Sequence, residues 1–187
     1  MPRKQRAKPV EEDTHLALRI EEFDASVFAG INHDALAPEF AWPLDEDDPV
    51  YKFTNQLRMS AIVTWPNRRL HERFALTIVG DDRHSMRLSA RLKDIRETDS
   101  DGSPRYRSYR GKEIRVLAPP HGLGSIDKVR GERAWRSWLF VAPRFVDQCR
   151  ALLIGMPDVF LALHEWKSGR SRWVRSLSLH TTDPAED

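Results

Sequence analysis

The stretch that decides the fold is Leu57-Arg-Met-Ser-Ala-Ile-Val-Thr-Trp65. Every second side chain in it is apolar, and the residues between them are polar except Ile62. A strand places successive side chains on opposite faces, so a period of two predicts a half-buried β-strand. The face from Leu57 to Trp65 is expected to line a core, and Arg58 is expected to face solvent.

Two further stretches with the same period follow, at residues 70–78 and 86–92. The turn signals Pro66-Asn67 and Gly80-Asp81-Asp82 separate the three stretches. Three successive alternating strands with short turns predict an antiparallel meander, with Arg87 and Arg91 facing solvent or a ligand. The predicted core of the meander comprises Met59, Ala61, Val63, Trp65, Phe74, Leu76, Ile78, Leu88 and Leu92.

The rest of the chain adds mainly β-structure. Strands are predicted at 16–23, at 105–117 with Gly111 as a bulge or a tight bend, and at 135–142, where an almost continuous apolar run indicates burial on both faces. Residues 26–49 carry three prolines and the acidic run 45–48, which predict a long loop, and residues 125–132 fit either a loop or a short helix. A β-hairpin is predicted from 159–166 and 172–180.

One helix is predicted, at residues 143–154. Pro143 suits the first turn, and apolar residues from Phe145 to Leu153 recur at spacings of three and four, with Cys149 on the same stripe. Leu152 and Leu153 are expected to pack against the sheet.

Together these elements predict a mostly β protein: an antiparallel sandwich or open barrel of about eight strands, with one packed α-helix at 143–154. Residues 15–181 are expected to form a single β-rich domain. Residues 1–14 and 182–187 are polar and lack periodicity, so they are predicted to be disordered tails.

Composition restricts the class of protein. The 187 residues include 40% hydrophobic and 31% charged residues, and no window is apolar enough for a spanning helix, so no membrane partner is expected. The net charge of +2 gives little general attraction to a polyanion, although 23 of the 30 basic residues are arginine. The single cysteine excludes an internal disulfide and favours a cytoplasmic location.

Familiar catalytic and metal-binding motifs are missing. The chain has no phosphate loop and no Gly-x-Ser-x-Gly elbow, and the seven histidines lack zinc-site spacing. The stretch Asp99-Ser-Asp101-Gly102 resembles the start of a calcium loop, but Arg110 stands where the final acid is needed. No cofactor, no metal site and no catalytic residue are therefore expected.

Basic and aromatic residues alternate in Arg105-Tyr106-Arg107-Ser-Tyr109-Arg110-Gly-Lys112. Arginine and tyrosine on a sheet surface can hold phosphates and stack on bases. The competing interpretation is an ordinary solvated strand, with one tyrosine in the core and several cations paired to acids such as Glu113. The candidate binding residues are Arg87, Arg91, Arg107, Tyr109, Arg110 and Lys112.

The leading functional expectation is a non-enzymatic, cytoplasmic binding or interaction module that takes a protein partner or a small ligand. The first alternative is a nucleic-acid-binding protein that uses the arginine- and tyrosine-rich strand. The second is a hydrolase whose carboxylates and histidines converge only in three dimensions, and a pocket with two carboxylates or a histidine–carboxylate pair would favour it.

Overall fold

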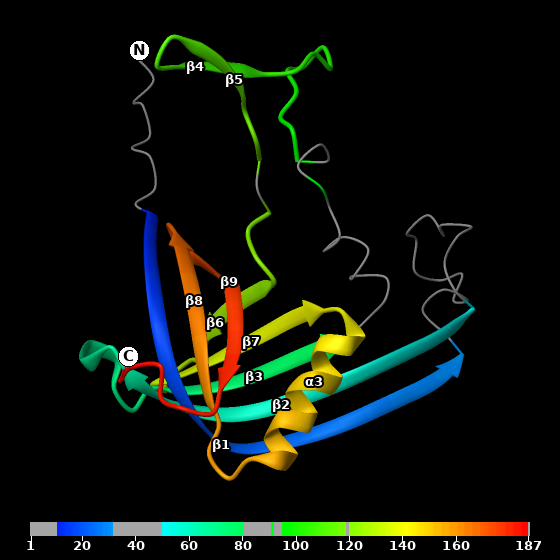
Figure 1. The fold of residues 1–187 in the computed structure, drawn as a ribbon, viewed down its shortest axis with the longest axis vertical. Coiled ribbons are helices and arrows are strands. Elements are labelled where there is room, and N and C mark those ends of the chain that lie inside the picture. Colours follow the sequence, from blue (N-terminus) through cyan, green and yellow to red (C-terminus); the bar gives the residue numbers. More distant parts are fainter. Residues whose placement is uncertain (1–10, 32–49, 81–90, 92–94, 119, 187) are drawn as a thin grey trace.

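A computed structural model describes residues 11–31, 50–80, 91, 95–118 and 120–186 (Figure 1). Seven of the strands in this part of the chain form a closed barrel in the order β1-β2-β3-β7-β6-β9-β8, and β8 pairs with β1 to close it. The barrel strands are β1 (Glu11–Ile31), β2 (Tyr51–Trp65), β3 (Arg73–Gly80), β6 (Gly124–Lys128), β7 (Ala134–Val141), β8 (Phe160–Ser168) and β9 (Ser171–His180). The mostly β fold is as predicted.

The sheet is mixed. β3 and β7 run parallel, and all other barrel neighbours are antiparallel. The prediction of an antiparallel sandwich or open barrel is corrected in two respects, because the barrel is closed and holds this parallel pair. Parallel neighbours need a long crossover, and here the chain between Gly80 and Ala134 supplies it. The predicted third meander strand, with Arg87, Leu88 and Leu92, lies outside the described residues, and β7 takes the place beside β3.

Several predicted boundaries change. β1 begins at Glu11, so residues 11–14, which were predicted to belong to a disordered tail, pair with β8. At its other end β1 continues to Ile31, which lies within the predicted loop 26–49. Residues 125–132, for which the sequence fitted either a loop or a short helix, begin within strand β6, which ends at Lys128. β7 alternates buried and exposed positions, with Trp138 exposed, so it is not buried on both faces as predicted.

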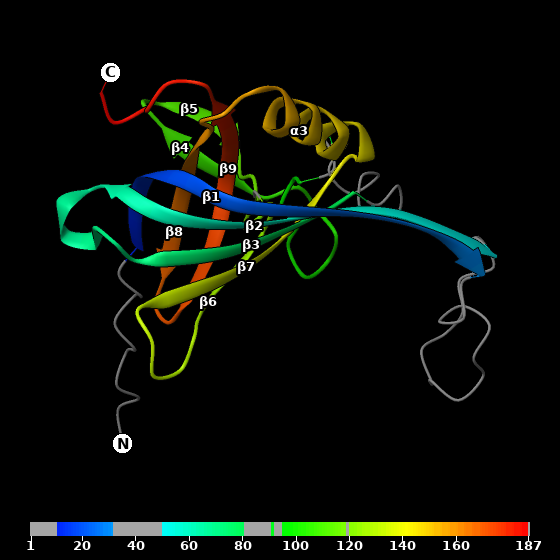
Figure 2. The same ribbon diagram turned by 90° about the horizontal axis from the view of Figure 1, so that it is seen from below.

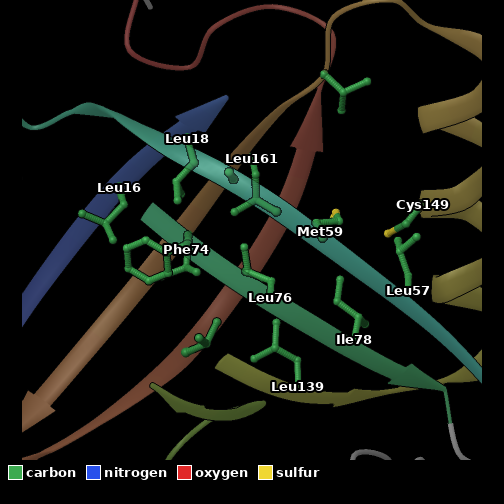
Figure 3. Close-up of a cluster of buried hydrophobic side chains, with 14 of the residues drawn as sticks. Leu16, Leu18, Leu57, Met59, Phe74, Leu76, Ile78, Leu139, Cys149 and Leu161 are labelled. Atoms are coloured by element: carbon green, nitrogen blue, oxygen red, sulfur yellow. The ribbon is translucent and has the colours of Figure 1, made fainter. Parts of the chain in front are cut away.

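The core fills the inside of the barrel (Figure 3). The predicted core positions Met59, Ala61, Val63, Phe74, Leu76 and Ile78 are all buried there. Trp65 was predicted to be buried but is 45% exposed, because it is the last residue of β2 and lies at the rim. Arg58 and Arg91 are exposed, as predicted.

Helix α3 (Pro143–Gly155) confirms the predicted helix and packs against β2 and β3. Its proline lies at the first turn, where the missing N–H costs nothing. Val146, Cys149 and Leu153 form its buried face, and Leu152 is partly buried beside them. The helix therefore covers the apolar face of the sheet at the end of the barrel toward which β1 runs (Figure 2).

A separate hairpin, β4 (Tyr106–Tyr109) and β5 (Lys112–Arg115), stands away from the barrel (Figure 1). Arg110 and Gly111 have φ of 50° and 74°, as a two-residue type I′ turn requires. Gly111 is therefore a turn residue, which fits the tight bend among the two predicted alternatives, whereas the predicted single strand 105–117 is wrong because two strands meet at this turn. An isolated bridge between Arg96 and Leu117 lies at the stem of the hairpin, and a second bridge, between Thr98 and Pro104, closes the turn at residues 99–103.

Candidate functional site

The basic hairpin, residues 105–115, brings together four of the six predicted binding residues. Arg107, Tyr109, Arg110 and Lys112 lie at its strands and turn, and every one of them is exposed. Arg91 is exposed but belongs to neither strand of the hairpin, and Arg87 lies outside the described residues. The structure thus gathers the sequence-predicted residues of 105–112 at one tip.

The expectation that one of the hairpin tyrosines belongs to the core is wrong. Tyr106 and Tyr109 are 52% and 55% exposed, because a two-stranded hairpin that stands off the barrel has no second layer to bury them. Glu113 lies across from Ser108 and forms no ion pair with another described residue. Among the cations for which pairing was predicted, Arg105 forms an ion pair, and its partner is Glu97 at 2.9 Å.

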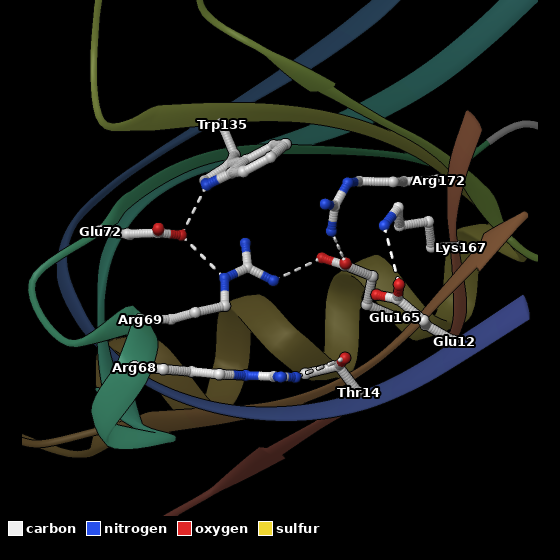
Figure 4. Close-up of polar contacts among 9 residues, drawn as sticks. All are labelled: Glu12, Thr14, Arg68, Arg69, Glu72, Trp135, Glu165, Lys167 and Arg172. Carbon is white, nitrogen blue, oxygen red and sulfur yellow. Dashed lines mark hydrogen bonds and ion pairs between the residues drawn. The ribbon is translucent and has the colours of Figure 1, made fainter. Parts of the chain in front are cut away.

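A second group of polar residues closes one end of the barrel (Figure 4). This barrel-end cluster consists of Arg69, Glu72, Trp135, Glu165 and Arg172. The 3₁₀ turn η1 (Asn67–Arg69) after β2 positions Arg69, which donates to Glu72 and to Glu165, both at 2.8 Å. The indole of Trp135 donates to Glu72 at 2.7 Å, and Arg172 donates to Glu165.

Charge in the barrel-end cluster is balanced, with two guanidinium groups and two carboxylates. Burial lowers the pKa of the Arg69 guanidinium, but hydrogen bonds to Glu165 and then to Glu72 outweigh this effect, so its pKa lies above the ordinary value. The guanidinium groups of Arg69 and Arg172 also lie over the Trp135 ring, 4.9 Å and 4.7 Å from its centre. Both carboxylates already accept hydrogen bonds from cations, so the cluster suits a structural closure of the barrel.

A histidine–carboxylate pair lies on the outer surface of the barrel. Nε2 of His164 is 2.9 Å from a carboxylate oxygen of Asp13, and the ring of His164 stacks on that of His15. The three residues belong to the paired strands β1 and β8. Within the described residues no group of histidine, cysteine and acidic side chains could hold a metal ion.

The single thiol lies under the helix. Cys149 is buried, and burial raises its pKa to about 11. A thiol with a raised pKa holds little thiolate near neutral pH, which makes it a poor nucleophile.

A feature that the sequence analysis missed is the arm, the paired residues 27–31 of β1 and 51–55 of β2. These residues project past the rest of the barrel (Figure 2). Five of its ten residues have large apolar side chains that are about half or more exposed, with Val27 at 70% and Phe53 at 65%; the others are Phe28, Ile31 and Tyr51. The signal was present, because apolar side chains recur at every second position from Phe23 to Ile31.

One face of the arm continues the core face of the sheet. Cross-strand partners share a face, and the register pairs Ala25 with Leu57 and, farther out, Ala29 with Phe53 and Ile31 with Tyr51. Leu57 is fully buried, yet Phe53 and Tyr51, four and six positions earlier on the same face, are exposed. The apolar face therefore extends beyond the part that α3 covers.

A pocket of about 360 Å³ lies at the root of the arm. Its lining includes Val27 and Phe53 from the arm and Pro143, Asp147 and Arg150 from α3. The side-chain amide of Asn55 donates to the Pro143 carbonyl and to Asp147, both at 3.1 Å, which fixes the helix against the root. The pocket offers apolar walls with one carboxylate and one guanidinium.

Both outer edges of the arm lack a neighbouring strand among the described residues. β1 pairs with β8 only from Glu11 to Arg19, and β2 pairs with β3 only from Asn55 onward. Backbone groups along an unpaired edge are available to another strand.

Comparisons of the chain with protein-family models, with curated proteins and with solved structures found no match. In the part of the chain that the structure describes, no helix is long and apolar enough to cross a membrane.

Proposed function

We propose that this protein is a non-enzymatic interaction module that binds a protein partner through the arm. The observation that carries the proposal is the continuation of the core face onto exposed residues of the arm, where Val27 and Phe53 are among the most exposed large apolar side chains. Contiguous exposed apolar surface is typical of an interaction site, because leaving it in water is unfavourable.

The open edges of the arm favour a partner that adds an extended segment. Main-chain hydrogen bonds along the edge of β1 would provide affinity, and alternate side chains would contact the apolar face. The pocket between the arm and α3 would accept one side chain of that segment. A protein partner fits these features better than a small ligand, because the unpaired edges call for backbone groups.

One observation supports an interaction module over a hydrolase, and another bears on its location. The interior carboxylates, Glu72 and Glu165, both form ion pairs with arginine side chains of the barrel-end cluster, so both are engaged in holding that end of the barrel together. The buried, unpaired Cys149 supports a cytoplasmic location for the module.

Photocrosslinking in cells tests the proposal. A photoreactive phenylalanine at Phe53 is expected to form one defined adduct with a protein, and the additional change Val27→Asp is expected to abolish it by placing a charge on the apolar face. The same amino acid at Trp138, which is exposed on the barrel wall, is the matched control and should give no such adduct.

Identical adducts from Phe53 and Trp138, or none from Phe53, would contradict the proposal. A crosslink from Phe53 to residues 32–49 of the same molecule would also contradict it, because the chain would then cover its own arm.

A further inference from the structure

The tip of the basic hairpin carries a concentration of charge that the arm does not use. Residues 105–115 include the five cations Arg105, Arg107, Arg110, Lys112 and Arg115 and the single acid Glu113, although the whole chain has a net charge of only +2. We propose that this tip is a binding site for single-stranded nucleic acid, separate from the protein-binding arm.

One face of the hairpin is cationic without an acid. The register places Tyr109 across from Lys112 and Arg107 across from Ile114, and these four residues share a face because they alternate with Ser108 and Glu113. Neither Arg107 nor Lys112 forms an ion pair with another described residue. Their charges are therefore available to phosphate groups of a bound strand.

Tyr109 supplies the second half of the recognition on this face. The guanidinium of Arg110 lies over its ring at 5.3 Å, and the side chain is 55% exposed. Tyr106, which pairs with Arg115, lies on the opposite face together with Glu113. A base can stack on an exposed aromatic ring while the adjacent cation contacts the backbone phosphate.

The turn presents these groups away from the rest of the molecule. With φ of 50° and 74°, Arg110 and Gly111 reverse the chain in two residues, so that Tyr109 and Lys112 flank the turn directly. The hairpin stands clear of the barrel (Figure 1), which leaves space for a strand to pass along its cationic face.

Single strands fit the hairpin better than a duplex or an acidic peptide. Bases inside a duplex are stacked on each other and cannot stack on Tyr109. An acidic peptide would use the cations but would leave the ring of Tyr109 in water. Tyr109 therefore decides between ligands that the charges alone do not distinguish.

Fluorescence anisotropy of labelled dT12 and rU12 with the full chain tests the site, at 50 mM and 150 mM salt. Arg107→Ala combined with Lys112→Ala is expected to weaken binding about tenfold or more at 50 mM salt. It should also make the negative slope of log K against log salt less steep by about 1.4, because each lost phosphate contact on a single strand reduces the magnitude of the slope by about 0.7. Tyr109→Ala is expected to weaken binding about 5- to 150-fold, the equivalent of about 1–3 kcal/mol per stacked base.

Two matched controls separate the hairpin from general charge and aromatic content. Arg130→Ala combined with Arg133→Ala removes two exposed cations from the β6–β7 connection and should leave the affinity within about twofold. Tyr51→Ala removes an exposed tyrosine from the arm and should have no effect on oligonucleotide binding.

Several results would overturn the site: a Kd weaker than about 100 μM at 150 mM salt, the limit of typical non-specific binding; tighter binding of a 12-base-pair duplex than of either single strand; or equal losses in the control and hairpin variants. Full displacement of the oligonucleotide by polyglutamate, with no effect of Tyr109→Ala, would identify an acidic protein as the ligand instead.

Discussion

Arg69 and Glu165 lie 96 positions apart in the sequence, and their side chains form a 2.8 Å ion pair inside the barrel. Arg69 belongs to the turn between β2 and β3, and Glu165 belongs to β8, so the pair joins the N-terminal half of the barrel to its last hairpin. Along β8, Leu161, Leu163 and Glu165 occupy every second position, and all three are buried. Glu165 therefore points into the barrel, as the two leucines do. A carboxylate in that position needs a cation, and it has two.

Removal of the Glu165 charge is expected to destabilise the fold strongly. Glu165→Gln leaves two guanidinium groups without their shared counter-ion, and loss of one partner of a buried pair costs about 3–5 kcal/mol. Urea unfolding followed by circular dichroism measures the loss. Glu12→Gln, which breaks the exposed pair with Lys167, is the control and should give no measurable change. Equal unfolding midpoints for the two variants would show that the buried pair is not stabilising.

Truncation of a buried side chain of α3 is expected to destabilise the protein, whereas truncation of the adjacent exposed side chain is not. Leu153→Ala should lower the free energy of unfolding by about 2–5 kcal/mol, because the side chain is buried against the core. Ile154→Ala is the control, since Ile154 is 71% exposed and its loss should cost less than about 0.5 kcal/mol. The order of the two effects would reverse if the helix packed on its other side.

The thiol of Cys149 is expected to make stability fall in alkaline solution. Its pKa is about 11 in the folded protein and lower when burial is lost, so the unfolded chain releases the proton first as the pH rises. The contribution is complete below the unfolded pKa and is lost as the pH rises toward about 11. Unfolding of the native protein and of Cys149→Ala, measured between pH 8 and pH 11, should show a steeper decline for the native protein. Parallel declines would place the thiol in water.

A methyl group at Gly124 is expected to disturb the junction of β6, β7 and β9. A Cβ atom there would overlap the backbone carbonyl of Trp138, which cannot move without breaking the ladder. Gly124→Ala should therefore cost about 1–3 kcal/mol, the usual range for overpacking. Gly155→Ala at the end of α3 is the control, because open space surrounds that position, and thermal unfolding compares the two. A stable Gly124 variant would require the β6–β7 register to differ.

Local periodicity explains which parts of the fold were predictable. β2, β3, α3 and the hairpin of β8 and β9 each carry a period of two or of three to four within a single segment, and each forms as expected. The parallel pairing of β3 with β7 and the pairing of β1 with β8 that closes the barrel join segments far apart in the sequence. The pattern within any one segment therefore does not predict them. The β1 half of the arm, residues 27–31, was assigned to the loop 26–49 because prolines follow it at 38, 43 and 49, although its own alternation continues to Ile31.

The candidate binding residues were predictable only in part. The basic and aromatic residues of the hairpin were identified as a group because they are adjacent in the sequence, although they were assigned to a single strand. The exposure of the two tyrosines could not be predicted, because that exposure depends on the absence of a second layer beneath the hairpin in the described structure. The barrel-end cluster was missed because its members come from five places in the chain: η1, the residue before β3, β7, β8 and β9. The only signal for it was the position of Glu165, which alternates in step with the buried Leu161 and Leu163.

The pairing of β1 with β8 has a consequence for synthesis on the ribosome. The first strand of the barrel emerges early, but its partner along residues 11–19 includes Ser168, roughly 150 residues later. At about 5–20 residues per second, the edge of β1 waits for about 8–30 s before its neighbour exists. During that interval the edge of β1 that will pair with β8 is open. The negative charges of Glu11, Glu12 and Asp13 on this strand would repel the same strand of a second nascent chain.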